Sequence, residues 1–192
     1  MARRILYLIR HGQYTSTTVP PQEPDGSLTE AGRQQAELVG KRLSRLPIAT
    51  IHHSTLHRAT ETAALVAKEI PNATLQATDL LRECIPCVPE EFKEHFTEIP
   101  AEFIEKSKTQ IEQAFAAFFQ PVEGETDRRE ILVSHGNLIS HFVCRILKAP
   151  CESWMLTDIS LGGFSEIMIA PNGFMKVQRH NDAGHLPLEL QP

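Results

Sequence analysis

Long apolar runs and an excess of positive charge are both missing from this sequence. None of its apolar runs approaches the ~20 residues that a membrane-spanning helix requires. Its 24 acidic residues outnumber its 19 basic residues, and the net charge is −5 with histidine neutral. We therefore expect no nucleic-acid partner and no membrane contact for this chain, since neither would be attracted by its charge.

We also expect no signal peptide, because Met1-Ala2-Arg3-Arg4 leads directly into the first apolar segment. The sequence therefore predicts a cytoplasmic protein, unless an N-terminal segment has been removed. The length of 192 residues suits one domain with a core of its own, and no linker or internal repeat divides the chain. We expect a single domain over 1–192.

Cysteine is scarce, and the four cysteines are too few for a disulfide scaffold. Cys84 and Cys87 form a C-x-x-C pair, but a redox or metal role would call for a following helix N-terminus or a second such pair. We expect Cys84, Cys87, Cys144 and Cys151 to be reduced thiols without function. The adjacent His52 and His53 would point to opposite faces of a strand, so their spacing predicts no metal site.

Apolar periodicity predicts strands that alternate with helices along the chain. Strands are expected at 5–9, 48–53, 75–81, 130–134, 163–170 and 174–179, and helices at 30–46, 56–70, 108–119 and in the segment that stops at Pro150. The inward residues of the last helix should be Ile139, Phe142, Val143, Ile146 and Leu147. Proline-rich loops are expected at 15–27 and 84–104, and the tail from His180 should be loosely held. The alternation predicts a mainly parallel α/β sheet with helices on both faces.

Charged residues follow three of these strands at the point where each strand ends. Arg10-His11-Gly12 follows the first strand, His53-Ser54 with Arg58 follows the second, and His135-Gly136 follows the fourth. Parallel neighbouring strands would bring two arginines and two histidines to one edge of the sheet. Arginine binds phosphate oxygens through two N–H groups, a neutral imidazole is a nucleophile near pH 7, and a helix N-terminus adds backbone donors. The pattern therefore predicts a phosphoryl site, with Glu83 as the proton donor to the leaving oxygen.

Five segments carry a resemblance to a known family. They are Leu8-Ile9-Arg10-His11-Gly12, Leu28-Thr29-Glu30-Ala31-Gly32-Arg33-Gln34-Gln35-Ala36, His53-Ser54-Thr55-Leu56-His57-Arg58-Ala59-Thr60-Glu61-Thr62-Ala63, Leu81-Arg82-Glu83 and Val133-Ser134-His135-Gly136. In this order and spacing the chain resembles the histidine phosphatase, or phosphoglycerate mutase-like, superfamily. The resemblance implies a three-layer sandwich with a mainly parallel central sheet and helices on both faces.

The resemblance also implies roles for individual residues. His11 would be the nucleophile that forms a phosphohistidine, and Glu83 would protonate the leaving alcohol and then activate water. The phosphoryl oxygens would be bound by Arg10, Arg58, His135 and Gly136. Gln13 would contact the substrate. The family uses no cofactor and no metal, which we interpret as two arginines and a cationic histidine neutralising the phosphoryl charge.

Several further segments are most similar to the mitochondrial serine/threonine protein phosphatase branch of the superfamily. They include Ile9-Arg10-His11-Gly12-Gln13-Tyr14, Asp79-Leu80-Leu81-Arg82-Glu83 and Ala170-Pro171-Asn172-Gly173. This similarity implies a phosphoprotein substrate, a homodimer formed partly through the C-terminal strand and tail, and a mitochondrial location as the alternative to a cytoplasmic one.

Three other functions stay open at this point. The chain could be a broad-specificity phosphatase of small molecules, a phosphoglycerate mutase, or a binding module without activity. Against the mutase, Gln13-Tyr14-Thr15-Ser16-Thr17 stands where glycolytic mutases carry an acidic residue, a tryptophan and an asparagine. Against the inactive module, the full set of expected catalytic residues is present.

Overall fold

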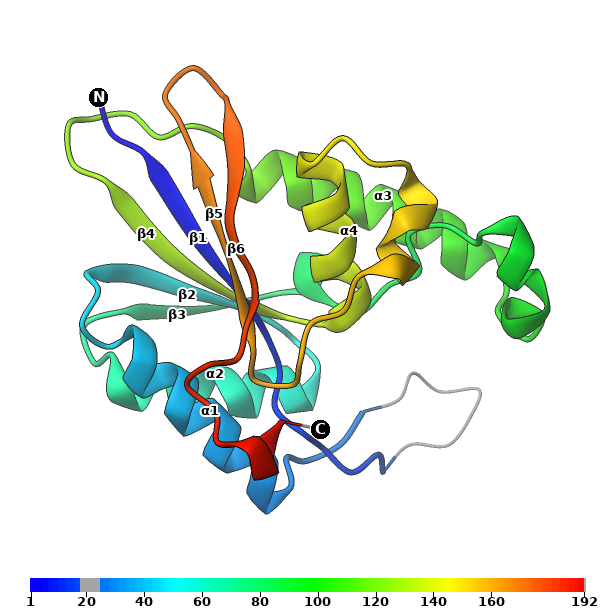
Figure 1. Ribbon diagram of the computed structural model, residues 1–192, viewed down its shortest axis with the longest axis horizontal. Helices are drawn as coiled ribbons and strands as arrows, with labels where there is room; N and C mark the ends of the chain where they lie inside the picture. Colours follow the sequence, from blue (N-terminus) through cyan, green and yellow to red (C-terminus); the bar gives the residue numbers. More distant parts are fainter. Residues whose placement is uncertain (18–24, 192) are drawn as a thin grey trace.

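A single six-stranded sheet forms the centre of the computed structural model, which describes residues 1–17 and 25–191 (Figure 1). Its strands lie in the order β3-β2-β4-β1-β5-β6. They are β1 (Arg4–Arg10), β2 (Ile48–Ser54), β3 (Thr74–Thr78), β4 (Arg128–Ser134), β5 (Phe164–Ile169) and β6 (Met175–Asp182). The first four strands in this order are parallel, β5 pairs antiparallel with β1, and β6 pairs antiparallel with β5. This confirms the predicted mainly parallel sheet.

Within the described residues, four α-helices cover the two faces of the sheet (Figure 1). They are α1 (Glu30–Leu43), α2 (His57–Glu69), α3 (Ala101–Phe118) and α4 (Gly136–Ile146). In the central strand β1, Ile5, Tyr7 and Ile9 pack in the core with α1 and α2. Leu6 and Leu8 face the opposite core, with α3 and α4, as the alternation of side chains along a strand requires. The predicted three-layer sandwich is confirmed, and none of the described helices is long and apolar enough to cross a membrane.

The loop after β1 is pressed closely against the start of α1. Thr29 caps α1, because its hydroxyl accepts a hydrogen bond from Gly32 N at 3.1 Å. A side chain at Gly12 would collide with the carbonyl of Gly32, and one at Gly32 would collide with the carbonyl of Gln13. The two glycines are therefore needed for the close approach that fixes the residues next to His11.

Several element boundaries differ from the sequence prediction. The third strand ends at Thr78 rather than residue 81, because the Thr78 hydroxyl accepts from Leu80 N at 3.2 Å and begins a 3-10 turn over Asp79–Leu81. Helix α3 begins at Ala101 rather than Lys108, since Pro100 is tolerated at a helix start. Within the predicted irregular segment, Glu90–Phe96 forms a 3-10 helix. The prolines of the predicted loop at 15–27 lie outside the described residues.

The C-terminal tail is held firmly against the body, so the prediction of a loose tail was wrong. Leu186 and Leu190 are buried, at 4% and 8% exposure, and Gln35 Nε2 donates to the carbonyl oxygen of Leu190 at 2.8 Å.

The inward-facing apolar residues of α4 end one residue earlier than expected. Leu147 is the C-cap of the helix and is 61% exposed.

The prediction that all four cysteines are reduced was wrong for two of them. Cys87 and Cys151 form a disulfide, with their Cα atoms 6.4 Å apart, while Cys84 and Cys144 are buried and not disulfide-bonded. The disulfide joins the segment after Glu83 to the 3-10 helix Cys151–Leu156, and Trp154 Nε1 donates to the carbonyl of Cys87 at 3.0 Å. Local sequence could not reveal this pairing, since the two segments meet only through tertiary packing.

Candidate active site

The predicted site residues lie at one edge of the sheet. Strand β4 lies between β2 and β1, with Arg10 opposite Ser134 and His53 opposite Val133. The three parallel strands therefore end level with one another. This arrangement confirms that neighbouring strands bring their charged ends to one edge, as the sequence pattern required.

His11 is buried and presents one unprotonated ring nitrogen. Its Nδ1 lies 2.9 Å from the carbonyl oxygen of Gly12, which can only accept, so the proton is on Nδ1 and the lone pair is on Nε2. Arg58 Nε donates to Nε2 at 3.1 Å. Burial lowers the pKa of His11 to about 3, with a further contribution from the Arg58 and Arg10 charges. The imidazole is therefore neutral at pH 7, as a nucleophile requires.

Arg58 is held in the first turn of α2 by a carboxylate from the loop before α1. Asp25 Oδ1 lies 3.2 Å from Arg58 Nη1, and Asp25 Oδ2 accepts from His57 N at 2.7 Å. Burial raises the pKa of Asp25, but the N–H groups of His57, Gly26 and Arg58 outweigh it and lower the pKa overall. Asp25 was missed from the sequence, where Asp25-Gly26 reads only as a turn.

Arg10 and His135 complete the cluster around His11. Arg10 Nη1 donates to the carbonyl of Ile159 at 2.6 Å, and His135 Nε2 lies 2.8 Å from Ser54 Oγ. The His135 and His11 rings are 5.0 Å apart. Among the described residues, Arg10 Nε and His135 Nδ1 are buried without a hydrogen-bond partner. A bound oxyanion would satisfy such groups.

The charge of His135 differs from the sequence interpretation. Burial, followed by the neighbouring His11 and Arg58, lowers the pKa of His135 well below its usual range. The ring is therefore neutral when no anion is bound, rather than cationic. The fixed positive charge of the site comes from the arginines.

Glu83 lies beside this cluster with an unusually high pKa. Burial raises the pKa of Glu83 to about 7, against the opposing effects of the Cys84 N–H group and of Arg58 and Arg10. Its Oε1 accepts from Cys84 N at 3.1 Å. The segment is anchored from both sides, since Ser134 Oγ donates to the carbonyl of Leu81 at 2.9 Å and Asn137 Nδ2 donates to the carbonyl of Cys84 at 3.0 Å. A carboxyl with this pKa exchanges protons readily near neutral pH.

The remaining predicted site residues have structural partners. Gln13 Oε1 accepts from the Thr29 hydroxyl at 2.7 Å, so its side chain is tied to the start of α1. A side chain at Gly136 would lie 3.3 Å from Arg10 Cζ, so glycine leaves room for the guanidinium. The contact of either residue with a ligand stays a prediction. No group of three or more potential metal ligands occurs within residues 1–17 and 25–191.

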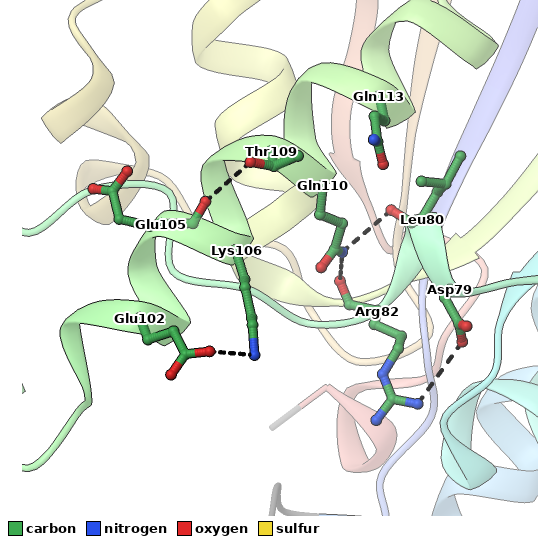
Figure 2. Close-up of a pocket in the computed structure, with 9 residues that line it drawn as sticks. All are labelled: Asp79, Leu80, Arg82, Glu102, Glu105, Lys106, Thr109, Gln110 and Gln113. Atoms are coloured by element: carbon green, nitrogen blue, oxygen red, sulfur yellow. Dashed lines mark hydrogen bonds and ion pairs between the residues drawn. The ribbon is translucent and has the colours of Figure 1, made fainter.

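A groove opens beside the Glu83 segment, between α3 and the turn that follows β3 (Figure 2). Its volume is about 630 Å³. Gln110 Nε2 spans it by donating to the carbonyl of Arg82 at 2.8 Å, and Arg82 Nη1 reaches Thr55 Oγ1 at 3.1 Å. The groove is thus lined by polar groups and adjoins the segment that carries Glu83.

Comparison with known proteins places this cluster in context. The model of the histidine phosphatase superfamily (branch 1) matches residues 6–183. The chain is 35% identical over 190 residues to the mitochondrial serine/threonine-protein phosphatase PGAM5 of Rattus norvegicus, covering 97% of this chain and 65% of that protein. It is 37% identical to the protein of the same name from Xenopus tropicalis, covering 98% and 68%. The chain thus spans about two thirds of the length of these relatives.

Solved structures share the fold. Bacillus stearothermophilus YhfR superposes with a TM-score of 0.75 at 24% identity, covering 95% of this chain and 98% of that one. The phosphoglycerate mutase of Plasmodium falciparum gives a TM-score of 0.68 at 23% identity, covering 98% and 96%. At these identities the likeness concerns the architecture alone.

Proposed function

The chain belongs to the histidine phosphatase superfamily, and on that premise we propose that it hydrolyses phosphomonoesters through a phosphohistidine on His11, without a metal. The observation that carries the proposal is the state of two groups at one sheet edge. His11 presents a neutral, unprotonated Nε2, and Glu83 has a pKa of about 7 beside it. These are the states that a nucleophile and a general acid need at neutral pH.

In the first step, His11 Nε2 attacks the phosphorus and the ester P–O bond breaks. Arg58 must release Nε2 as its guanidinium turns to the phosphoryl oxygens, together with Arg10 and His135. Protonated Glu83 gives its proton to the leaving alcohol oxygen. The two arginines compensate the charge on the transferred group, which is the principal need of phosphoryl transfer.

In the second step, ionised Glu83 takes a proton from water, which attacks the phosphohistidine. The P–N bond breaks, phosphate leaves, and Glu83 is protonated again for the next cycle. One carboxyl serves as acid and then base because its pKa of about 7 lies near the working pH. The Nδ1–H bond to Gly12 keeps the ring oriented throughout.

Phosphoserine or phosphothreonine in proteins is the substrate class that we propose. Relatives at 35–37% identity carry the name of serine/threonine-protein phosphatases. The polar groove beside the Glu83 segment (Figure 2) offers space for the residues that flank a phosphorylated side chain. We also propose that the chain forms a homodimer through β6, and that it acts in mitochondria as the names of these relatives state.

The phosphoenzyme is the direct test of this proposal. The protein is incubated briefly with a ³²P-labelled phosphoserine peptide, and the reaction is stopped with alkali. The ³²P should then be bound to the chain through a bond that is stable to base and labile to acid. His11→Ala should carry no label. His57 is an exposed histidine of α2, and the control variant His57→Ala should be labelled as the wild type is. Label that persists in His11→Ala would show that another residue is the nucleophile.

Product analysis separates the alternative reactions. With 3-phosphoglycerate, a phosphatase releases free phosphate, whereas formation of 2-phosphoglycerate would establish a mutase. Equal kcat/KM values for phosphopeptides and small sugar phosphates would favour a broad-specificity phosphatase. Activity should also persist after treatment with EDTA, and its loss would reveal a required metal.

A further inference from the structure

A cationic pocket adjoins the Cys87–Cys151 disulfide, away from the His11 cluster. It has a volume of about 550 Å³ and lies against α4, and both cysteines line it. The volume falls within the range of about 300–1,000 Å³ usual for small-molecule sites. Both cysteines are half-buried, so the disulfide can be reached from this pocket.

The charge of the pocket is opposite to that of the molecule. Lys108, Arg145 and Lys148 line it, and Glu112 is the one carboxylate among its lining residues. Glu112 is held by Arg145, whose Nη2 lies 3.0 Å from Glu112 Oε2. Lys108 is paired with Glu105, a residue outside the lining, at 2.6 Å, so the uncompensated positive charge of the pocket comes from Lys148. Lys148 is exposed and makes no ion pair with any of the described residues. In a chain of net charge −5, such a pocket favours an anionic ligand.

A histidine lies beside one sulfur of the disulfide. His141 Nδ1 is 3.9 Å from Cys151 Sγ, and both residues line the pocket. Burial, with the charge of Arg145, lowers the pKa of His141, so its ring is neutral at pH 7. With the proton on Nδ1, this ring can donate to a thiolate that forms on Cys151. Stabilising a leaving thiolate accelerates thiol–disulfide exchange.

We propose that the Cys87–Cys151 disulfide is a reversible exchange site for an acidic low-molecular-weight thiol that binds in this pocket. A ligand thiolate attacks Cys87 Sγ, the sulfur–sulfur bond breaks, and its electron pair goes to Cys151, where His141 donates a hydrogen bond. A second ligand thiolate attacks the ligand sulfur of the mixed disulfide and releases Cys87. Two ligand thiols are thereby oxidised to one ligand disulfide. The two electrons and two protons that they lose reduce the Cys87–Cys151 disulfide to two thiols.

The exchange bears on the site at the sheet edge. Cys87 lies four residues after Glu83, in the segment that Asn137 anchors through the carbonyl of Cys84. Cys151 begins the 3-10 helix that leads to Ile159, whose carbonyl holds Arg10. The disulfide thus ties together the supports of the acid and of a phosphate-binding arginine. Reduction should loosen both supports and lower kcat by about 3- to 10-fold, since catalysis is sensitive to small displacements.

The binding part is tested by exchange rates measured on the oxidised full chain. Reduced glutathione, an anionic thiol, is compared with neutral 2-mercaptoethanol at equal thiolate concentration, with free thiols trapped by alkylation and counted by mass spectrometry. Lys148→Gln should slow the glutathione reaction about 3- to 10-fold and leave the 2-mercaptoethanol reaction unchanged. As a control, Lys68 is an exposed lysine of α2, and Lys68→Gln should alter neither rate.

Several results would overturn the binding part. One is that Cys87 and Cys151 remain thiols after the protein has been oxidised. Others are equal exchange rates with glutathione and 2-mercaptoethanol, or equal slowing of both reactions by Lys148→Gln. A mixed disulfide mapped to Cys84 or Cys144 would also contradict it. His141→Gln should slow exchange with both thiols, because it acts on the leaving sulfur rather than on the ligand charge.

The link to activity rests on the proposed phosphatase function and is measured separately with p-nitrophenyl phosphate. The reduced chain and the Cys87→Ser, Cys151→Ser double variant should share the lowered kcat, and the double variant should not respond to glutathione. Unchanged kcat on reduction would refute the link. No turnover in either redox state would instead count against the phosphatase function, since the exchange rates do not depend on it.

Discussion

At the scale of single residues, the pKa of Glu83 makes its role measurable. Glu83 is expected to protonate the leaving oxygen. Serine alkoxide is a poor leaving group and needs this proton, whereas p-nitrophenolate leaves readily without it. Glu83→Gln should therefore lower kcat on a phosphoserine peptide about 10²- to 10⁴-fold and slow formation of the phosphoenzyme from p-nitrophenyl phosphate far less. The limb of the pH profile near pH 7 should vanish with it. Equal losses in this first step would argue against Glu83 as the acid.

The same residue should weaken the fold at alkaline pH. The pKa of Glu83 is raised from 4.5 to about 7 on folding, so the folded state binds more protons than the unfolded state between these values. The free energy of unfolding should fall as pH rises through this window, and be lowest above pH 7. Glu83→Gln cannot ionise, so above pH 7 its free energy of unfolding should exceed that of the wild type by up to about 3 kcal/mol. Urea melts at pH 4 and pH 8 should show the variant gaining only at pH 8.

Asp25 is expected to act on the substrate through Arg58. Asp25→Asn keeps the shape but removes the negative charge that faces Arg58 Nη1 at 3.2 Å. Losing a partly buried hydrogen-bonded charge should let the guanidinium drift from the position beside His11 Nε2, raising KM about 3- to 10-fold with a smaller effect on kcat. Phosphate inhibition, measured as Ki, should weaken in parallel. Glu30 is an exposed carboxylate paired with Arg33, and Glu30→Gln is the matched control. Equal KM values in Asp25→Asn and the wild type would contradict the role of Asp25.

At the scale of elements, the contact between the β1 loop and α1 sets the position of the nucleophile. Gly32→Ala would drive a methyl group into the carbonyl of Gln13, so the loop must move. We expect a loss of about 1–3 kcal/mol in unfolding free energy, together with reduced kcat because Gly12, which holds His11 Nδ1, belongs to the same loop. Gln34→Ala on the exposed face of α1 should change neither quantity. Normal stability in Gly32→Ala would show that the loop accommodates the methyl group.

The elements also show where local sequence suffices. The Thr29 cap and the buried residues of α1 (Ala36, Val39, Gly40, Leu43) follow from capping chemistry and helical spacing, and both are present. The early end of β3 and the early start of α3 were missed. In both places a 3-10 turn or a proline at a helix start produces no apolar period, so the pattern gives no signal.

At the scale of the whole molecule, β6 is an outer strand of the sheet and is where we expect the homodimer to form. Antiparallel two-fold pairing of two β6 strands about the middle of the strand would place Gln178, which lies there, close to its own copy. Gln178 is exposed on β6, and Gln178→Asp would bring like charges together, which destabilises strand pairing. Sedimentation equilibrium should show a dimer for the wild type and weaker association for the variant. A monomer for the wild type at all concentrations would refute this assembly.

The order of the elements along the chain follows from local sequence patterns. Buried strands that end in Arg10-His11-Gly12 and His135-Gly136, and helices with apolar stripes, are local patterns, and their alternation predicts a mainly parallel sheet. The strand order that makes β2, β4 and β1 neighbours was seen only in the structure. The tertiary structure alone decided the protonation of His11, His135 and Glu83, because desolvation depends on what packs around each group. It also decided the pairing of Asp25 with Arg58 and of Cys87 with Cys151. These partners are distant in sequence, and no local period connects them.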